Sequence, residues 1–186
     1  MLLNMKKDSI LQEISLPESV IVSLDAGSLS IRGPKGEVRR ELKQHKISIK
    51  IENQKIIIRS ERSTRNDKKN VGSLVAHIKN MVRGCQQNHV YILKICSGHF
   101  PMSVSVSGGR LVVKNFLGEK VPRVLELKSD IDVKVHGDMI YVTSPSKELA
   151  GQTSASIEQL TRRPGYDGRV FQDGIWMISK DGKELK

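Results

Sequence analysis

The feature that most constrains the fold of this chain is an internal repeat. The stretch GSLSIRGPKGEVRREL at residues 27–42 aligns with GRLVVKNFLGEKVPRVLEL at residues 109–127, with one small slip in register. Apolar residues fall on apolar ones and a Gly-Glu pair falls on a Gly-Glu pair: Leu29 on Leu111, Ile31 on Val113, and Gly36-Glu37 on Gly118-Glu119. The chain is therefore expected to build one supersecondary unit twice.

The repeat continues into two further strand patterns. ISIKI at residues 47–51 matches IDVKV at residues 131–135, and both alternate apolar with polar residues, which is the period of a half-buried strand. NQKIIIR at residues 53–59 then matches GDMIYVT at residues 137–143, and the first two residues of each suit a tight hairpin turn. Each copy thus predicts an antiparallel sheet.

Both copies turn helical after these strands. One apolar face in the first copy consists of Leu74, Ile78, Met81 and Val82, and Gly84 is predicted to cap its C-terminal end. In the second copy we predict that Ser144 caps the N-terminus and that Pro145 occupies the first turn, ahead of the apolar stripe Leu149, Ala150, Thr153, Ile157 and Leu160. The sequence therefore predicts an α+β fold of two tandem duplicated domains, each an antiparallel sheet packed on one helix.

The predicted domains divide near GCQQNH, residues 84–89. We assign residues 1–84 to the first α+β domain and residues 85–164 to the second. Residues 165–186 fall outside the repeat and form a C-terminal extension, in which Ile175–Ile178 predicts a short apolar strand that closes a sheet.

The net charge of +11 predicts a polyanionic partner, which leaves nucleic acid, an anionic membrane surface and acidic proteins open. The first ten residues lack a signal-peptide core, and no apolar run approaches the roughly 18 residues that span a bilayer. A cytoplasmic protein is expected. A disulfide between Cys85 and Cys96 stays open, although reduced thiols are favoured in that compartment.

Catalytic motifs are missing from the sequence. GPKGEV at residues 33–38 is not a phosphate loop, because no Lys-Ser or Lys-Thr follows and a strand pattern comes next. No serine sits in a nucleophile elbow, and the histidines have no metal-ligand spacing: His45, His77, His89, His99 and His136. We predict no enzymatic activity, no metal, no cofactor and no small-molecule substrate.

Basic residues gather in loops and at strand ends. Residues 32–50 hold seven Lys or Arg against two acids, and residues 59–69 and 110–128 each hold five against two. This distribution favours a polyanion touched at several points over a helix inserted in a groove. Aromatic residues make up only 4% of the chain, and Phe100, Phe116 and Phe171 are predicted to be core. We therefore expect helical RNA bound by backbone and shape, and no membrane binding, since neither helix has a dense basic face.

Three separated motifs carry a resemblance to a known family. GHFPMSV at residues 98–104, NFLGEK at residues 115–120 and DGRVFQDGIWMISK at residues 167–180 resemble the large-subunit ribosomal protein six family, in its archaeal and eukaryotic branch, whose eukaryotic member is number nine. The resemblance runs from about Pro17 to Lys180. It implies two similar α+β domains on the large ribosomal subunit, near the stalk base and the RNA loop where translational GTPases dock.

The resemblance also implies partners and site residues. Ribosomal RNA would bind mainly to the second domain and the C-terminal extension, with neighbouring ribosomal proteins as further partners. Arg169, Phe171, Asp173 and Gly174 match the closing motif of the family, in which Arg169 would contact RNA and Phe171 and Asp173 would shape the loop. The candidate RNA-binding residues are Arg110, Lys114, Asn115, Gly118, Lys120, Arg123, Arg162, Arg163, Arg169, Lys180 and Lys183.

Departures from the family pattern concern single contacts. Pro164 and Gly165 stand where relatives keep polar or basic residues, and residues 59–70 lack the tryptophan-bearing stretch common in eukaryotic members. The alternative function is an extra-ribosomal protein-interaction module that uses exposed sheet edges. In that case charge reversal at Lys120 and Arg123 would leave partner binding intact.

Overall fold

The computed structural model describes residues 10–25, 27–42, 47–52, 54–60 and 64–185. It forms two compact units, Met1–Gln87 and Asn88–Lys186. Asn53, which we predicted in a hairpin turn, and His45 lie outside the described residues. The predicted domain limits at residues 84 and 164 stay predictions.

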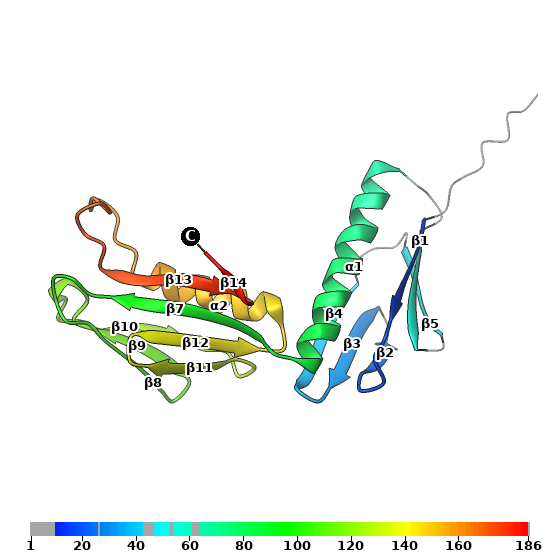
Figure 1. Cartoon of the computed structure of the whole chain (residues 1–186), viewed down its shortest axis with the longest axis horizontal. Helices are drawn as coiled ribbons and strands as arrows, with labels where there is room; N and C mark the ends of the chain where they lie inside the picture. Colours follow the sequence, from blue (N-terminus) through cyan, green and yellow to red (C-terminus); the bar gives the residue numbers. More distant parts are fainter. Residues whose placement is uncertain (1–9, 26, 43–46, 53, 61–63, 186) are drawn as a thin grey trace, which may run out of the picture. The chain divides into compact units, whose positions relative to one another are not determined.

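The described residues of the first unit form two three-stranded antiparallel sheets and one long helix (Figure 1). One sheet has the order β1-β6-β5 and the other has the order β2-β3-β4. The elements are β1 (Ile10–Ser15), β2 (Ile21–Asp25), β3 (Ser28–Gly33), β4 (Gly36–Glu41), β5 (Ile47–Glu52), β6 (Lys55–Ser60) and α1 (Arg65–Gln86).

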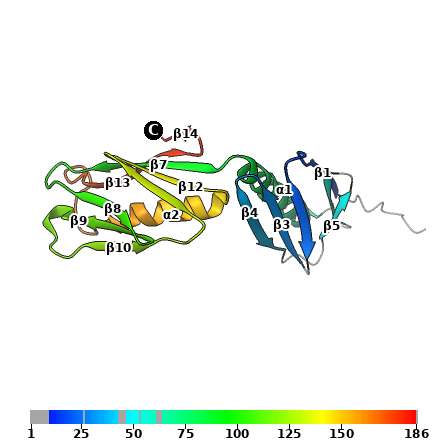
Figure 2. The same ribbon diagram turned by 90° about the horizontal axis from the view of Figure 1, so that it is seen from below.

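The second unit repeats this order of elements and extends it (Figure 2). Its sheets have the orders β10-β9-β8 and β11-β12-β7-β13-β14. The elements are β7 (His89–Cys96), β8 (Ser103–Ser107), β9 (Arg110–Lys114), the 3-10 turn η1 (Phe116–Gly118), β10 (Arg123–Glu126), β11 (Asp132–His136), β12 (Met139–Ser144), α2 (Lys147–Leu160), β13 (Gly174–Lys180) and β14 (Lys183–Glu184). The α+β class is confirmed, with the sheet of each unit divided in two.

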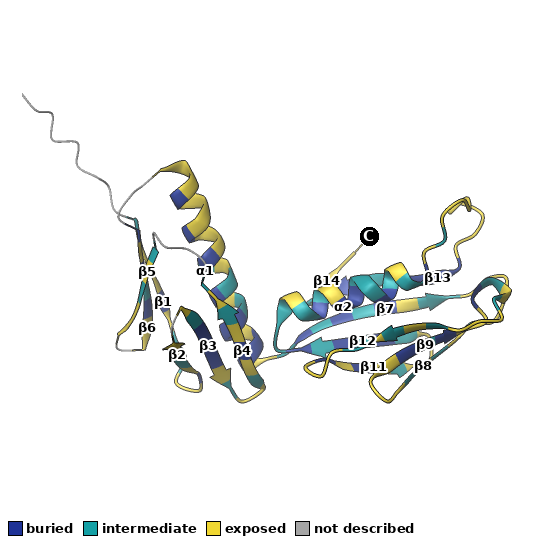
Figure 3. Cartoon of the chain, turned by 180° about the vertical axis from the view of Figure 1, so that it is seen from behind, coloured by how far each residue is buried: buried dark blue, intermediate teal, exposed yellow. Residues whose placement is uncertain are grey.

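The buried residues follow the repeat predicted from the sequence. Each unit has its own apolar cluster between its helix and its sheets, and the alternation of buried and exposed positions along the strands is visible in Figure 3. The matched residues Leu29, Ile31, Leu111 and Val113 are all at most 1% exposed. The apolar positions of the repeat therefore specify two equivalent cores.

Both predicted helix caps are wrong. In the first unit the helix runs through Gly84 to Gln86, because Cys85 is packed against β3 and its thiol donates to the Ile31 carbonyl oxygen at 3.2 Å. In the second unit the N-cap is Ser146, whose hydroxyl accepts from the Leu149 N–H. Ser144 ends β12, where its hydroxyl donates to the Asp130 carbonyl oxygen instead. The cysteines Cys85 and Cys96 are both free.

The hairpin between β3 and β4 lies close to the C-terminal end of α1. A Cβ placed on Gly33 would lie 2.7 Å from the Cys85 carbonyl oxygen, so any side chain there would collide with the helix backbone. The same carbonyl accepts a hydrogen bond from the Lys35 N–H at 3.0 Å. The first Gly-rich turn therefore packs on protein, and glycine is required for that approach.

Strand β13 joins the sheet of the second unit beside β7, with which it is antiparallel. Its N-terminal end is held by α2, since the Ile175 N–H donates to Thr161 Oγ1 and the Met177 N–H donates to Glu158 Oε1. At its other end Asp181 lies 3.0 Å from the buried His89 ring and 3.5 Å from Lys147 Nζ. The segment after the repeat is thus an integral strand.

Candidate RNA interface

Three loops of the second unit meet at one end of it (Figure 1). They are residues 97–102 after β7, residues 115–122 after β9 and residues 161–173 after α2. Asn115 Nδ2 donates to the Pro101 carbonyl oxygen at 2.9 Å and so joins the second loop to the first. Asp173 joins the third loop to the first by accepting from the Gly98 N–H at 2.7 Å. We call this surface the three-loop end.

The second loop has a tight backbone conformation. Asn115, Leu117 and Gly118 all have positive φ, at 58°, 47° and 77°. Non-glycine residues adopt such angles rarely, so the surrounding contacts must hold them there. Phe116 provides the anchor, because its ring is 2% exposed inside the core of the unit. The loop is therefore fixed before any ligand arrives.

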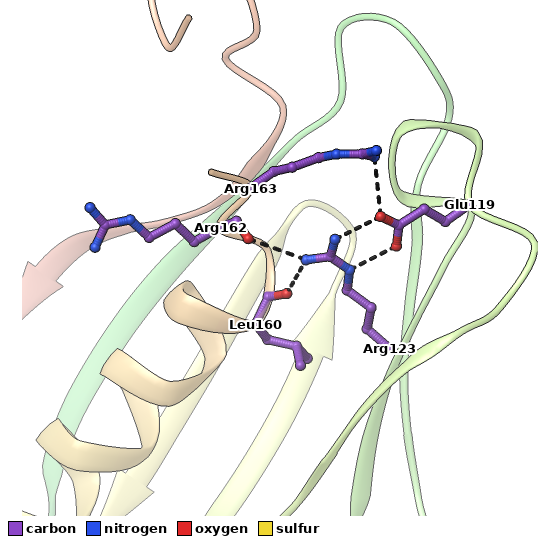
Figure 4. A network of polar contacts seen from close by, with 5 residues as sticks. All are labelled: Glu119, Arg123, Leu160, Arg162 and Arg163. Atoms are coloured by element: carbon purple, nitrogen blue, oxygen red, sulfur yellow. Dashed lines mark hydrogen bonds and ion pairs between the residues drawn. The ribbon is translucent and has the colours of Figure 1, made fainter. Parts of the chain in front are cut away.

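Arg123 ties this loop to the end of helix α2 (Figure 4). Its guanidinium donates from Nε and Nη2 to both carboxylate oxygens of Glu119, at 2.8 and 2.7 Å. Nη1 donates to the Leu160 carbonyl oxygen at 2.6 Å and to the Arg162 carbonyl oxygen at 3.4 Å. A bidentate pair of this kind combines charge with fixed geometry. Most donors of Arg123 are thus used inside the protein.

The carboxylate of Glu119 accepts hydrogen bonds from two arginine side chains. Arg163 Nη1 donates to Glu119 Oε1 at 3.2 Å, in addition to the pair with Arg123. The Arg123 hydrogen bond, aided by the charge of both arginines, holds the pKa of Glu119 below its ordinary value. Both arginines also lie over aromatic rings, Arg123 over Phe116 and Arg163 over Tyr166. Glu119 therefore stays ionised in the pH range in which the cell works.

Asp173 organises the other side of the three-loop end. Its buried carboxylate accepts from the N–H groups of Gly98 and His99 and contacts His99 Nδ1 at 2.5 Å. Burial by itself raises the pKa of Asp173, but the hydrogen bonds from His99 and Gly98 outweigh burial and lower it. The His99 ring lies 5.0 Å from the ring of Phe171, which in turn lies 5.0 Å from that of Tyr166.

The cations that remain for a ligand are Lys114, Lys120 and Arg162. All three are exposed, and among the described contacts none of their side chains is in an ion pair. Arg169 pairs with Asp167 at 3.2 Å, yet its side chain is 91% exposed. The hydrogen bonds from Arg169 hold the pKa of Asp167 below its ordinary value. Such an exposed pair is weak and can exchange its carboxylate for a phosphate.

Three of the predicted residues do not lie at the three-loop end. Arg110 begins β9, and Lys114, at the other end of that strand, adjoins the loop. Lys180 ends β13, which begins beside the three-loop end at Gly174, and Lys183 follows it in β14. Arg110 also pairs with Glu126 across the strands at 3.1 Å. The structure therefore divides the predicted RNA-binding residues between two ends of the unit.

The sequence prediction that all three phenylalanines are core is wrong for two of them. Phe116 is buried, but Phe100 is 49% exposed and Phe171 is 36% exposed, and Tyr166 in the third loop is 45% exposed. Aromatic residues exposed among cations form a platform that can stack on nucleic-acid bases. Gln172 and Asp173 after Phe171, and Pro101 after Phe100, indicate loops. The prediction of a core position gave these neighbours too little weight.

The first copy of the Gly-Glu turn differs from the second. Glu37 lies in β4 directly after a tight hairpin and accepts from Arg32 and Ser30, at 2.7 and 2.9 Å. The Arg32 hydrogen bond lowers the pKa of Glu37. No 3-10 turn follows in the described residues of this hairpin, and the glutamate serves only neighbours within β3 and β4. Both turns contact their helix, but only in the second copy, among the described contacts, does the glutamate itself connect to the helix end, through Arg123 and Arg163.

Two properties of the whole described chain bear on function. None of its helices is both long and apolar enough to cross a bilayer. Within the same described residues, His, Cys, Asp and Glu side chains form no group of three that is suited to a metal ion.

Comparison with known proteins gives a consistent set of relatives. The family model described as Ribosomal protein L6 matches residues 16–88 and 100–174. Proteins named Large ribosomal subunit protein uL6 are similar over most of both chains. The one from Methanothrix thermoacetophila is 40% identical, covering 93% of this chain and 98% of its own. Those from Methanococcus vannielii and Nanoarchaeum equitans are 39% and 42% identical, covering 95% and 93% of this chain and 97% and 94% of theirs.

Proposed function

The chain belongs to the ribosomal protein L6 family, with archaeal relatives, and we propose that it binds ribosomal RNA through the three-loop end of its second unit. Membership makes it a structural protein of the large ribosomal subunit and not an enzyme, as the sequence predicted. Its localisation is therefore the large subunit of the cytoplasmic ribosome.

One observation carries the proposal: unpaired cations and exposed aromatic rings occur together on loops that hydrogen bonds join to one another and to α2. Lys114, Lys120 and Arg162 supply positive charge without internal ion-pair partners among the described residues, and Phe100 and Phe171 supply flat apolar surface beside them. Phosphates are neutralised by such cations, and the bases of unpaired nucleotides stack on such rings. This supports a junction of helical and single-stranded RNA as the ligand.

The internal arginines make this surface ready for binding. Arg123 and Glu119 hold the second loop against α2, and Asp173 holds the first and third loops together. A loop that is already ordered loses little conformational entropy when it binds. We therefore assign Arg123 and Arg163 to positioning the loops, and Lys114, Lys120 and Arg162 to contacting phosphates. Arg169 contacts a phosphate by exchanging its ion pair with Asp167 for one with the RNA backbone.

We further propose that this RNA lies in the region where translational GTPases dock, near the base of the stalk. The support is the motif resemblance at residues 98–104, 115–120 and 167–180, which map to the three loops and β13. Neighbouring ribosomal proteins are the expected second class of partner. Arg110, Lys180 and Lys183 at the other end form a separate candidate contact.

The test is incorporation of charge-reversed chains into large subunits. Lys114→Glu, Lys120→Glu and Arg162→Glu are combined in the full chain, which is expressed in cells and followed through a sucrose gradient. We expect the protein to leave the large-subunit fractions and to remain at the top. The matched control reverses three exposed lysines of the same unit outside the loops, Lys94, Lys128 and Lys134, and is expected to sediment with the subunits.

The possible outcomes distinguish the three-loop end, total charge and the other end of the unit as the determinant of RNA binding. Normal incorporation of the loop variant would contradict the proposal. Loss with both variants would mean that total charge, not the three-loop end, governs binding. Reversal of Arg110, Lys180 and Lys183 tests the other end directly, and loss there alone would move the interface to it.

Tethered hydroxyl-radical probing tests the location. An iron chelate is attached to a cysteine introduced at Lys120, in a chain whose half-buried Cys96 is replaced by serine and whose other cysteine, Cys85, is buried. Cleavage of ribosomal RNA in the GTPase-docking loop is the expected result. Cleavage confined to distant RNA would refute that location and leave RNA binding itself intact.

A further inference from the structure

The outer edge of β1 in the first unit is open where its counterpart in the second unit is covered. Strand β1 ends the order β1-β6-β5, whereas β7, in the same position of the repeat, has β13 on that side. The equivalence is supported by a shared hydrogen bond: the Leu16 N–H donates to Gln54 O, and the Ile95 N–H donates to Asp138 O, both at 2.8 Å. No described strand pairs with the outer edge of β1.

The backbone of β1 has groups aimed at that open side. In an antiparallel pair, alternate residues direct both N–H and C=O to the partner strand, and the residues between them direct these groups away. Because Leu16 is bonded to the β6 side, the outward residues are Leu11, Glu13 and Ser15. These groups are a ready template for one more strand.

A groove lies beside the open edge. Its volume is about 350 Å³, and it is lined by Glu13, Ile14 and Ser15 of β1 and by Lys79, Val82 and Arg83 of α1. Ile14 and Val82 give it an apolar floor, since they are 5% and 8% exposed. An extended peptide placed on the edge would set every second side chain into this groove.

The second unit shows what fills the equivalent place. The buried positions of the two helices match when Val71 is placed on Ala150 and Ile78 on Ile157. That register places Lys79 and Val82 on Glu158 and Thr161. In the second unit the side chains of these two residues accept hydrogen bonds from the backbone of β13. The groove of the first unit is thus the empty counterpart of the seat of β13.

We propose that the open edge of β1 and its groove bind an extended acidic segment of another protein as an added antiparallel strand. The charge argument comes from Lys79, which is a cation at the position where Glu158 contacts β13. Its charge favours carboxylates on the incoming segment, and the charge of Glu13 is already offset by Lys55 at 3.2 Å. The proposal goes beyond RNA binding by the second unit and does not rest on it.

The repeat also explains why this edge, and no other edge of the same sheet, is chosen. Strand β5 ends the sheet on its other side, but its counterpart β11 ends its own sheet in the second unit as well. Among the described strands, β1 is the position at which the second copy carries a neighbouring strand, β13, and the first copy does not. RNA has no backbone amide pattern that pairs with a strand edge, so a polypeptide fits this surface better.

Photo-crosslinking in cells tests the occupant. A photoreactive side chain is placed at Glu13 of the full chain, and a control is placed at Lys50 on β5. After irradiation the crosslinked species are purified under denaturing conditions and identified by mass spectrometry. We expect a peptide of another protein with alternating apolar and acidic residues at Glu13, and no such product at Lys50.

The charge and the backbone are tested separately. Lys79→Glu is expected to lower the crosslink yield at least about tenfold, which corresponds to about 1.4 kcal/mol, while Lys69→Glu on the same helix outside the groove leaves it unchanged. For the backbone, the photoreactive group is moved to Gln86, which also lines the groove. Glu13→Pro removes one outward N–H and is expected to abolish the crosslink. Glu13→Ala keeps this N–H and is expected to preserve the crosslink.

Proline is tolerated on an edge strand, so each variant is expected to fold. Circular dichroism of each variant checks this. Crosslinks from Glu13 to RNA, to residues 1–9 of the same chain or to a second copy would each overturn the proposal and name the true occupant. Absence of any crosslink, or equal yields from Glu13→Pro and Glu13→Ala, would also overturn it. Failure of the chain to enter ribosomes would not overturn the proposal, because the crosslink is measured in whole cells.

Discussion

Among single residues, Arg123 shows how a cation in a basic loop can serve the fold. It makes two hydrogen bonds to Glu119 and two to carbonyl oxygens at the end of α2, and its guanidinium lies 4.5 Å from the centre of the Phe116 ring. Lys120, three residues earlier, is exposed and has no such partners in the described structure. Neighbouring cations of equal charge thus have different functions.

Replacement of Arg123 by lysine tests this division. An ammonium group cannot keep the bidentate pair and the carbonyl contacts together, so Arg123→Lys should lower the free energy of unfolding by about 2 kcal/mol. Lys120→Ala should leave it within about 0.5 kcal/mol and weaken RNA binding instead. Urea unfolding followed by circular dichroism measures the first effect. Equal stability of Arg123→Lys and the unaltered chain would show that the network is dispensable.

The pKa of Glu119 gives the loop network a predictable pH dependence. Because the folded pKa lies below the unfolded one, the network contributes stability above the unfolded value, near 4.3, and loses it as the pH falls through the folded value. Glu119→Gln should therefore be less stable than the unaltered chain at pH 6, by about 1 kcal/mol, and this difference should shrink as the pH falls below the unfolded pKa. A difference that stays constant from pH 6 to pH 3 would contradict this assignment.

Among the elements, β13 distinguishes the two units. It pairs with β7, buries Ile175 and donates backbone hydrogen bonds to two residues at the C-terminal end of α2. In the first unit no described strand pairs with the same side of the sheet. The segment after the repeat therefore completes the second unit as a strand and delivers the third loop to the three-loop end.

Truncation measures what this strand contributes. A chain that ends at Pro164 loses β13 and β14, exposes the edge of β7 and uncovers one side of α2. We expect the second unit to lose about 3 kcal/mol or more, since the burial of Ile175 alone is worth roughly 1.5–3 kcal/mol. Hydrogen exchange of β7 amides should rise accordingly. A chain that ends at Gly182 is the control and should exchange like the full chain; equal protection in both truncations would show that β13 is only an appendage.

The elements also show how far the sequence alone reaches. The strands of the repeat were predictable because period-two alternation places Leu29 and Ile31, and Leu111 and Val113, in equivalent cores. The helix ends were not, because Cys85 is held by tertiary contacts that extend α1 past Gly84. Local propensity loses to such contacts.

The candidate site was predictable only in part, for a related reason. The sequence identified the basic loops of the second unit but not which cations are free. That depends on Glu119, which meets Arg163 from a loop 44 positions away in the chain. The exposure of Phe100 and Phe171 was missed because phenylalanine is among the residue types most often buried. Both errors concern contacts between segments distant in sequence.

Across the whole molecule, charge and the proposed RNA surface do not coincide. The first unit has seventeen Lys or Arg against nine acids, and the second has fourteen against eleven. The more basic unit is thus the one without the three-loop end. Several of its cations are paired locally, as Arg32 is with Glu37 and Lys55 with Glu13. Net charge attracts RNA to either unit, whereas the arrangement of cations and aromatic rings selects the second.

The salt dependence of RNA binding by the full chain distinguishes attraction from contact. Each phosphate neutralised changes the slope of log K against log salt by about 0.7–0.9. Reversal of Lys114, Lys120 and Arg162 should therefore reduce the slope by about 2–3 on a ribosomal RNA fragment, measured by filter binding over a range of KCl concentrations. An equal reversal in the first unit, at Lys35, Lys50 and Lys69, should change the slope by less than about 1. If the two variants lose equal slope, both units neutralise phosphates, and the first unit shares the RNA surface that we assign to the second.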